Sequence, residues 1–289
     1  MNFTVYPAVD ISEGKCVRLL QGRFGTETVY SDDPVKVALG LAKAGARWLH
    51  IVDLDGARRG GLGQTAEQTR GGLGQTAEQT RGGLGRTAEP TPGSNRELVL
   101  EVVRHSSCPV QAGGGLRGMD DVVEVLAAGA SRAVLGTVAL EDPAELARVC
   151  KRFGERIAVS LDARGDELTS HGWTVGSGMP LLDAVRLFAE AGVSMFIYTD
   201  VSRDGTMSGP NLAGVTRLAQ QTSLPVIASG GVGTLNELRQ VARLHGIGVR
   251  GAIVGRALYE GKFSVIEAVR AADEVASGRH DPRIGPDGG

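Results

Sequence analysis

The chain has 289 residues, of which 42% are hydrophobic and 22% charged, and its formal net charge at pH 7 is −2. These values are typical of a globular protein of one or two domains, and the lack of a basic excess argues against nucleic acid as a partner. No apolar run approaches the ~18 residues that a membrane-spanning helix requires, so we expect no membrane partner either.

The cysteines and the first residues bear on where the protein works. Cys16, Cys108 and Cys150 are odd in number and lack metal-ligand spacing, which favours free thiols in a reducing compartment. The opening segment MNFTVYPAVD has no basic region followed by a long apolar run, unlike a secretory signal. We therefore expect a cytoplasmic protein without a bound metal.

Short apolar runs alternate with segments of helical periodicity along most of the chain. The apolar runs cover 5–10, 48–55, 109–112, 133–135, 157–162, 195–200, 225–228 and 251–254, with a further short extended piece at 16–19. The helical segments cover 33–44, 96–105, 120–128, 143–153, 179–191, 212–221, 235–244 and 265–276. The runs do not alternate between apolar and polar residues, as is typical of buried parallel strands, and repeated strand–helix units predict a (β/α)8 TIM barrel. An open doubly wound sheet is the alternative, but no early G-x-G-x-x-G motif supports it.

Residues 60–92 interrupt this pattern with three 11-residue units, of which the first two read GGLGQTAEQTR without a difference. Each unit has one leucine and three glycines, so it can neither bury a core nor form a stable helix. We interpret the segment as a neutral low-complexity insert in the loop after the second strand; a lid or partner-binding role is the alternative. The expected organisation is one barrel over 1–276, this insert, and a disordered polar tail at 277–289.

Two glycine-rich stretches follow the same order: an apolar run, a glycine turn, a helical segment, and an apolar run that ends in glycine. Glycine turns let backbone N–H groups approach an anion, and the following helix adds a positive dipole end. The repetition predicts a half-barrel internal repeat and a ligand with a phosphate at each end, although tight turns alone would also need glycine. The candidate phosphate-binding residues are Gly114, Gly115, Arg117, Gly136 and Thr137 in the first stretch, and Ser229, Gly230, Gly231, Gly255 and Arg256 in the second.

Carboxylates occur where predicted strands end, which is where a barrel carries its functional side chains. Asp10 ends the first strand and Asp162 the fifth, so the two should face each other across the mouth, while Asp204 follows the sixth strand. Paired carboxylates in a dry site tend to separate their pKa values and provide one acid and one base. Asp53, Asp55 and Asp200 also end strands, and we expect them to be structural.

Arg18, Trp173 and two histidines complete the candidate residues. Arg18 lies near the mouth, and Trp173, on the loop after the fifth strand, is expected to be exposed and to stack on a planar ring. A loop anchor packed on the barrel rim is the alternative role for Trp173. The spacing of His50 and His171 suggests neither a metal site nor a catalytic triad.

Several motifs together resemble the ProFAR isomerase family of histidine biosynthesis, whose members isomerise a phosphoribosylformimino-aminoimidazolecarboxamide ribotide. The resemblance covers nearly the whole chain except about 60–93 and the tail. The motifs are PAVDISEGKCVRLLQG, LHIVDLDGA, AGGGLR, LGT, SLDARG, TDVSRDGTMSGPN, ASGGV and GAIVGRALYEGKF.

The resemblance implies a (β/α)8 barrel that acts without metal or cofactor on a small bisphosphate substrate, and we expect a monomer. The family reaction is an Amadori rearrangement of an aminoaldose to an aminoketose. By resemblance, Asp10 is the general base that takes a proton from ribose C2, and either Asp162 or Asp204 is the acid that protonates the ring oxygen. Thr199 would orient the substrate, Arg18 and Trp173 would clamp it, and Gly205 belongs to the same substrate-binding set.

Two features leave alternatives open. The dual-substrate phosphoribosyl isomerase A relatives, which also act on phosphoribosyl anthranilate, usually carry an arginine where this chain has His171, yet the segment 22–28 resembles theirs. The insert also falls on the catalytic face, where it could reshape specificity. The sister cyclase of imidazole glycerol phosphate synthesis, which usually has a lysine at the place of Arg18, and a non-catalytic phosphate-binding barrel are further alternatives.

Overall fold

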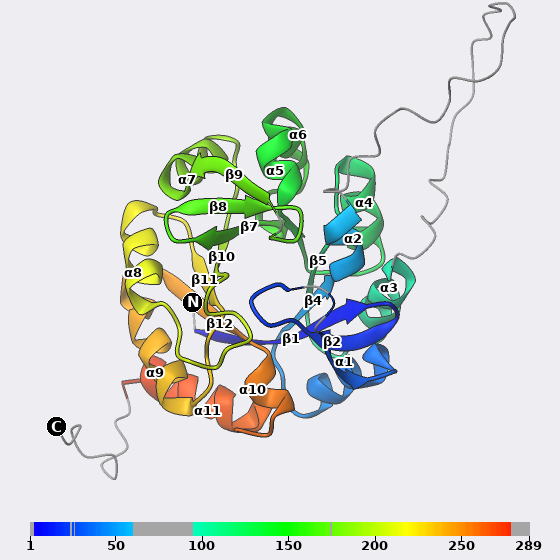
Figure 1. The fold of residues 1–289 in the computed structure, drawn as a ribbon, viewed down its shortest axis with the longest axis vertical. Coiled ribbons are helices and arrows are strands. Elements are labelled where there is room, and N and C mark those ends of the chain that lie inside the picture. The colour runs from blue at the N-terminus through cyan, green and yellow to red at the C-terminus, as the bar shows by residue number, and fades with distance from the viewer. Residues whose placement is uncertain (1–2, 24, 26, 60–94, 174, 279–289) are drawn as a thin grey trace, which may run out of the picture.

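The computed structural model describes residues 3–23, 25, 27–59, 95–173 and 175–278. Its centre is a closed ring of parallel strands, in which each strand pairs with the next and the last pairs with the first (Figure 1). The strands of the ring are β1 (Thr4–Ser12), β4 (Leu49–Asp53), β5 (Val110–Gly113), β6 (Arg132–Leu135), β7 (Ile157–Arg164), β10 (Phe196–Asp200), β11 (Val226–Ser229) and β12 (Val249–Val254). The predicted TIM barrel is therefore confirmed, and the open sheet is wrong.

Helices surround the ring on the outside (Figure 1). The long ones are α1 (Pro34–Lys43), α3 (Arg96–His105), α4 (Met119–Ala127), α6 (Pro143–Phe153), α7 (Leu181–Glu190), α8 (Leu212–Gln221), α9 (Leu235–Arg243) and α11 (Val265–Ala276). Shorter turns are α2 (Leu54–Arg59), α5 (Thr137–Glu141), α10 (Arg256–Tyr259), η1 (Gly154–Arg156) and η2 (Leu244–Ile247). Local signals explain the starts: Asp33 and Asp142 cap helices that open on proline, and Thr234 and Ser264 form capping boxes.

Four further strands extend the ring at its mouth. β2 (Lys15–Arg18) and β3 (Thr28–Ser31) continue from β1, and β8 (Glu167–Ser170) and β9 (Val175–Pro180) continue from β7, all in antiparallel pairing. The sequence predicted only the first of these. The expected start of a helix at residue 179 is wrong, because Met179 and Pro180 complete β9 and the helix begins at Leu181. The β8–β9 hairpin holds Trp173 near its tip.

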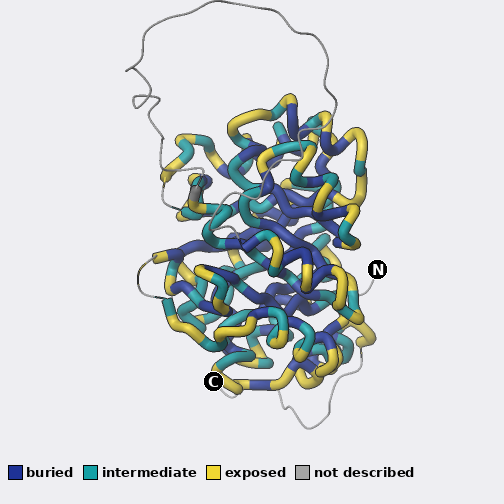
Figure 2. Tube along the Cα trace, turned by 90° about the vertical axis from the view of Figure 1, so that its right-hand side faces the viewer, coloured by how far each residue is buried: buried dark blue, intermediate teal, exposed yellow. Residues whose placement is uncertain are grey.

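The core has two layers, one between strands and helices and one inside the ring. The inner layer consists of Tyr6, Ala8, Val134, Ala158, Ile197, Ile227 and Ile253, with Trp48 and Met195 packed against it. Buried chain accordingly runs through the middle of the molecule, and exposed chain lies on its outside (Figure 2). Because these side chains fill the ring, space for a ligand remains at the carboxyl ends of the strands.

Residues 60–94, which contain the tandem repeats, lie outside the described residues, as does the tail from 279 onward. Hydrogen bonds join the residues that precede this gap to those that follow it. Asn95 is 5% exposed, and its Nδ2 donates to Asp53 Oδ1 at 2.8 Å and to Asp55 Oδ2 at 3.0 Å. Its Oδ1 accepts from the Gly14 N–H at 2.9 Å. The barrel thus fixes both ends of the segment through contacts that do not involve the repeats.

Deleting residues 60–92 is expected to leave the melting temperature within about 5 °C of the wild type, or slightly raised, because a shorter loop costs less closure entropy. Differential scanning calorimetry checks this. The Asn95→Ala variant of the full chain serves as the comparison and should destabilise the protein by about 1–3 kcal/mol, since it leaves the buried Asp53 carboxylate without that donor. A fall of more than about 10 °C on deletion would show that the repeats contribute to the fold.

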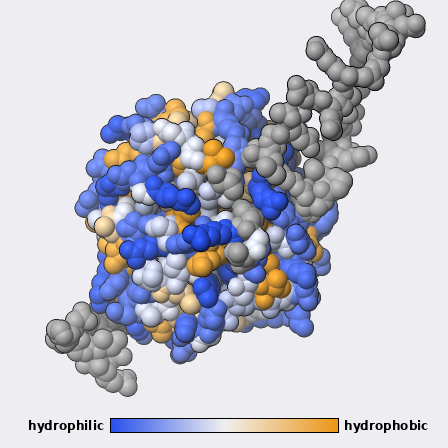
Figure 3. Space-filling model, viewed as in Figure 1, coloured by the Kyte–Doolittle hydropathy of each residue, from blue (hydrophilic) through white to orange (hydrophobic). Residues whose placement is uncertain are grey.

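None of the described helices is long and apolar enough to cross a membrane. On the face seen in Figure 3, hydrophobic residues form small separate patches among hydrophilic ones. Of the cysteines, Cys16 and Cys150 are buried and Cys108 is half-buried, and all three are free thiols, as expected.

Candidate active site

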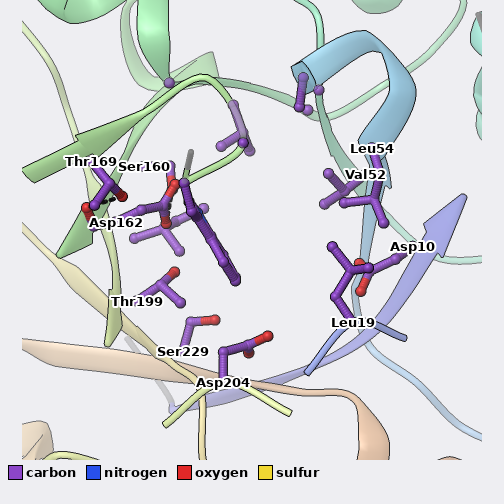
Figure 4. Close-up of a pocket in the computed structure, with 18 of the residues that line it drawn as sticks. Asp10, Leu19, Val52, Leu54, Ser160, Asp162, Thr169, Thr199, Asp204 and Ser229 are labelled. Carbon is purple, nitrogen blue, oxygen red and sulfur yellow. Dashed lines mark hydrogen bonds between the residues drawn. The ribbon is translucent and has the colours of Figure 1, made fainter. Parts of the chain in front are cut away.

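A cavity of about 980 Å³ opens at the carboxyl ends of the barrel strands. All eight strands of the ring contribute to its wall, and every site residue expected from the sequence lines it. Figure 4 shows Asp10 and Asp162 on opposite sides of this cavity, with Thr199 on the side of Asp162 and Asp204 at the lower edge between the two sides. The expected opposition of the two aspartates across the mouth is therefore correct.

The two glycine turns have the same backbone shape. Gly114 and Gly115 have φ values of +90° and +70°, and Gly230 and Gly231 have values of +91° and +88°. A side chain at Gly114 would overlap the backbone of Asp53, and one at Gly231 would overlap the backbone of Gly209. Only glycine combines this conformation with so close an approach. The matched contacts agree with a half-barrel repeat, which stays a prediction.

Each turn leads into a helix whose first turn carries an acid. The Arg117 N–H donates to Asp121 at 2.8 Å, and the Gly233 N–H donates to Glu237 at 2.7 Å. These amides are satisfied within the protein. A phosphate would therefore depend on the other hydrogen-bond donors of the two glycine-rich stretches, which we call the cradles. Arg256, at the second cradle, donates from Nη1 to the Gly205 carbonyl at 2.8 Å. This contact ties the cradle to the loop that carries Asp204.

Asp10 is ion-paired with Arg18 inside the barrel. Arg18 Nη1 lies 2.5 Å from Asp10 Oδ2, and Nη2 donates to the Ala8 carbonyl. The guanidinium also lies over the ring of Tyr259, 5.1 Å from its centroid, and a side chain at Gly255 would place its Cβ 2.5 Å from Arg18 Cζ. Burial raises the pKa of Asp10, and the Arg18 charge opposes the shift. Arg18 is thus held beside the carboxylate, and its contact with a substrate stays a prediction.

Asp204 resists ionisation. Burial raises its pKa to about 7, and the nearby negative charges of Asp10 and Asp162 add to the shift. Asp162 differs, because Ser160 Oγ donates to its Oδ1 at 2.7 Å and the side chains of Trp173 and Thr199 also hydrogen-bond to it. Burial is the larger effect and raises the pKa of Asp162 as well, while these bonds favour the ionised carboxylate and oppose the shift.

Loops from three strands meet over the cavity. The Gln21 N–H donates to the Asp204 carbonyl at 3.0 Å, and a side chain at Gly22 would overlap the indole of Trp173. The expectation that Trp173 is exposed is wrong: it is half-buried, because its ring lies in the cavity wall between Gly22 and Asp162. It has a φ of +71°, so the loop holds it in an unusual backbone conformation.

His171 occupies the position where dual-substrate relatives usually have an arginine. Its Nε2 lies 2.9 Å from Glu141 Oε1, and its Nδ1 lies 3.0 Å from Ser170 Oγ. Its backbone N–H donates to Thr137 Oγ1 at 3.0 Å. The imidazole, which lines the cavity, therefore already has two side-chain partners, Glu141 and Ser170.

The acids expected to be structural do form structural networks. Asp200 Oδ2 accepts from Asn211 at 2.7 Å and its Oδ1 accepts from Ser202, while Asp53 and Asp55 bind Asn95. His50 also lines the cavity, and the sequence analysis assigned it no role because its environment comes from neighbouring strands. The described residues contain no group of three or more histidines, cysteines or acids that could hold a metal.

A sequence model of the family described as "Histidine biosynthesis protein" matches residues 4–70 and 87–264. The chain belongs to this histidine biosynthesis family. The interruption of the match at 71–86 falls within the tandem repeats, so the family pattern continues on both sides of the insert.

Curated relatives in this family are similar over nearly their whole length. A protein of Geobacillus kaustophilus is 41% identical over 94% of this chain and 98% of its own, and one of Moorella thermoacetica is 41% identical over 93% and 98%. A Salinispora tropica protein is 42% identical over 93% and 98%. All three are named as isomerases of 1-(5-phosphoribosyl)-5-((5-phosphoribosylamino)methylideneamino)imidazole-4-carboxamide, which is ProFAR.

Proposed function

We propose that this protein is the ProFAR isomerase of histidine biosynthesis and converts ProFAR to PRFAR by an Amadori rearrangement. The observation that carries the proposal is the 41–42% identity to isomerases of this name over 93–94% of the chain. The cavity supports it, because three half-buried carboxylates line it together with the two glycine turns. The protein works as a cytoplasmic monomer, and one barrel over 1–276 performs the reaction without a cofactor.

The two phosphates of the substrate bind at the two cradles. The first cradle offers Gly114, Gly115 and Thr137, and the second offers Gly230, Gly231 and the cation of Arg256. Holding both ends fixes the reacting sugar between the aspartates, and binding energy from the phosphates supports the reaction at a centre remote from them.

The first chemical step opens the ribose ring. Asp204 holds a proton near neutral pH, because burial raises its pKa to about 7, and it gives this proton to the ring oxygen. The C1–O bond breaks as the nitrogen lone pair forms a C=N bond, which leaves a protonated Schiff base. When ionised, Asp162, whose carboxylate accepts hydrogen bonds from Ser160 and other donors, stabilises this cation.

The second step moves one carbon-bound proton. Asp10 takes the proton from C2, and the electron pair of that bond neutralises the iminium to give an enolamine. The enolamine gains a proton at C1 and loses the one on O2, which yields the ketone, so protons gained and lost by the sugar balance. Arg18 keeps Asp10 in place and Thr199 orients the substrate, while Trp173 covers the site.

The pure protein is expected to turn over ProFAR and to leave phosphoribosyl anthranilate unchanged or nearly so. The reason for the second result is that the dual-substrate relatives usually have an arginine at this position, whereas the His171 side chain here already contacts Glu141 and Ser170. Steady-state absorbance assays with both substrates check this. Absence of ProFAR turnover would overturn the proposal, and comparable rates on both substrates would instead establish the dual-substrate isomerase.

A further inference from the structure

His50 lies in β4 and lines the cavity, but no step above uses it. It stands beside Ala8 of β1 on one side and Gln111 of β5 on the other, and Gln111 stands beside Arg132 of β6. Three polar side chains from three adjacent strands thus follow one another across the interior of the barrel, among apolar neighbours.

Hydrogen bonds connect the three side chains in one direction. Arg132 Nη1 donates to Gln111 Oε1 at 2.8 Å, and the Gln111 amide nitrogen lies 3.0 Å from His50 Nδ1. An arginine side chain can only donate, so the amide oxygen must face Arg132 and the amide NH₂ must face His50. His50 Nδ1 is therefore an acceptor, and the imidazole proton sits on Nε2.

The chain of hydrogen bonds from Arg132 through Gln111 to His50, which we call the relay, is held in place at the Arg132 end. Gln111 is fully buried, and Arg132 is 9% exposed. The Arg132 guanidinium lies over the ring of Trp48, 4.7 Å from its centroid, and Trp48 packs against Tyr6. Neither side chain can turn without breaking buried contacts, so the orientation of the Gln111 amide is set by the fold.

Charge reinforces the neutral state of the imidazole. Burial and the positive charges of Arg18 and Arg132 lower the pKa of His50 to about 3. Protonation of Nδ1 would also place two donors against each other at the Gln111 amide. The ring is therefore neutral at every pH at which the protein is expected to work.

We propose that His50 binds the substrate as a neutral Nε2–H donor to an oxygen of the opened sugar, with Gln111 and Arg132 as positioning residues that set its tautomer. This rests on the proposed isomerase function. A neutral donor suits that reaction, because the intermediate is a cationic Schiff base that an imidazolium would repel at short range. The residue thereby stabilises charge on a sugar oxygen without opposing the iminium.

The tautomer is tested by ¹⁵N NMR of protein labelled at histidine, with His50→Gln used to assign the signal. We expect a protonated Nε2 and an unprotonated Nδ1 that stay unchanged between about pH 5 and 8. In Gln111→Glu, the new carboxylate accepts from Nδ1 and pairs with Arg132, so the proton should move to Nδ1 and the ring should titrate at higher pH. An Nδ1–H tautomer or an imidazolium in the wild type would overturn the relay.

The donor role is tested by kcat/KM for ProFAR. His50→Leu should lose about 10- to 100-fold, and His50→Gln, whose amide can still donate, should stay within about tenfold of the wild type. Gln111→Glu should lose about 10-fold or more and gain a new pH dependence. Circular dichroism confirms that each variant folds, and the wild-type NMR result stands even if one does not. Wild-type kcat/KM in His50→Leu would overturn the assignment alone, whereas an inactive wild type would overturn the isomerase proposal and this inference with it.

Discussion

The Asp10→Asn variant is expected to lower kcat for ProFAR by about 10²- to 10⁴-fold, the range that a positioned general base contributes. The asparagine keeps the size of the side chain but cannot take the proton from C2. Since both cradles remain intact, KM should change much less than kcat. Steady-state kinetics on ProFAR, read at several pH values, measures both constants.

The control for Asp10→Asn is Asp32→Asn, the same chemical change at a surface acid that pairs with Lys15 and is 82% exposed. It should leave kcat unchanged, because exposed ion pairs contribute little. Asp10→Asn also leaves Arg18 buried without its carboxylate, which is costly, so thermal unfolding must accompany the kinetics. Near-normal kcat in a folded Asp10→Asn protein would show that another group is the base.

Asp204→Asn is expected to lower kcat by about 10²- to 10⁴-fold and more than Asp162→Asn does, because Asp204, whose pKa is raised to about 7, is the proposed proton donor, whereas Asp162 is proposed to stabilise the cation. The wild-type rate should fall as pH rises through about 7, where this proton is lost. Asp162→Asn should keep that alkaline decline, since it leaves Asp204 in place. A larger loss of kcat in Asp162→Asn would show that Asp162 is the acid and Asp204 is not. Equally small losses of kcat in the two variants would show that neither residue is the acid.

The same titration has a consequence for stability that can be measured without substrate. The pKa of Asp204 rises from 3.8 in the unfolded chain to about 7 in the folded one, so the folded state binds the proton more tightly between these values. The stability gained from this is complete below about pH 4 and is lost as pH rises through about 7. Asp204→Asn cannot ionise, so its melting temperature relative to the wild type should increase from pH 5 to pH 8.

The barrel was predictable because its signals are local. Helix caps and apolar spacing placed α3, α6, α8 and α11 at their observed bounds, and every strand of the ring was found within a few residues. The β8–β9 hairpin was not predictable, because β9 reads GSGMP over most of its length and four of its six residues are exposed. Its strand geometry comes from pairing with β8, which the sequence does not reveal.

The candidate site was likewise predictable from the sequence only in part. The glycine cradles and the strand-end aspartates followed from motif order, since a closed parallel barrel brings the carboxyl ends of its strands to one mouth. The choice between Asp162 and Asp204 did not follow, because it depends on which acid receives hydrogen bonds and which is left near other negative charges. The position of Trp173 between Gly22 and Asp162 likewise requires two loops distant in the chain.

The sequence by itself determined that eight strand–helix units form a barrel, that two glycine turns resemble each other, and that aspartates end opposite strands. Only the tertiary structure decided the side-chain partners and the pKa shifts: Arg18 beside Asp10, the raised pKa of Asp204, and the hydrogen bonds from Arg132 through Gln111 to His50. The physical reason is the separation along the chain of the residues that determine each property. Periodicity, caps and turns depend on residues a few positions apart, whereas pKa values and side-chain hydrogen bonds depend on burial and charge that neighbouring strands bring together.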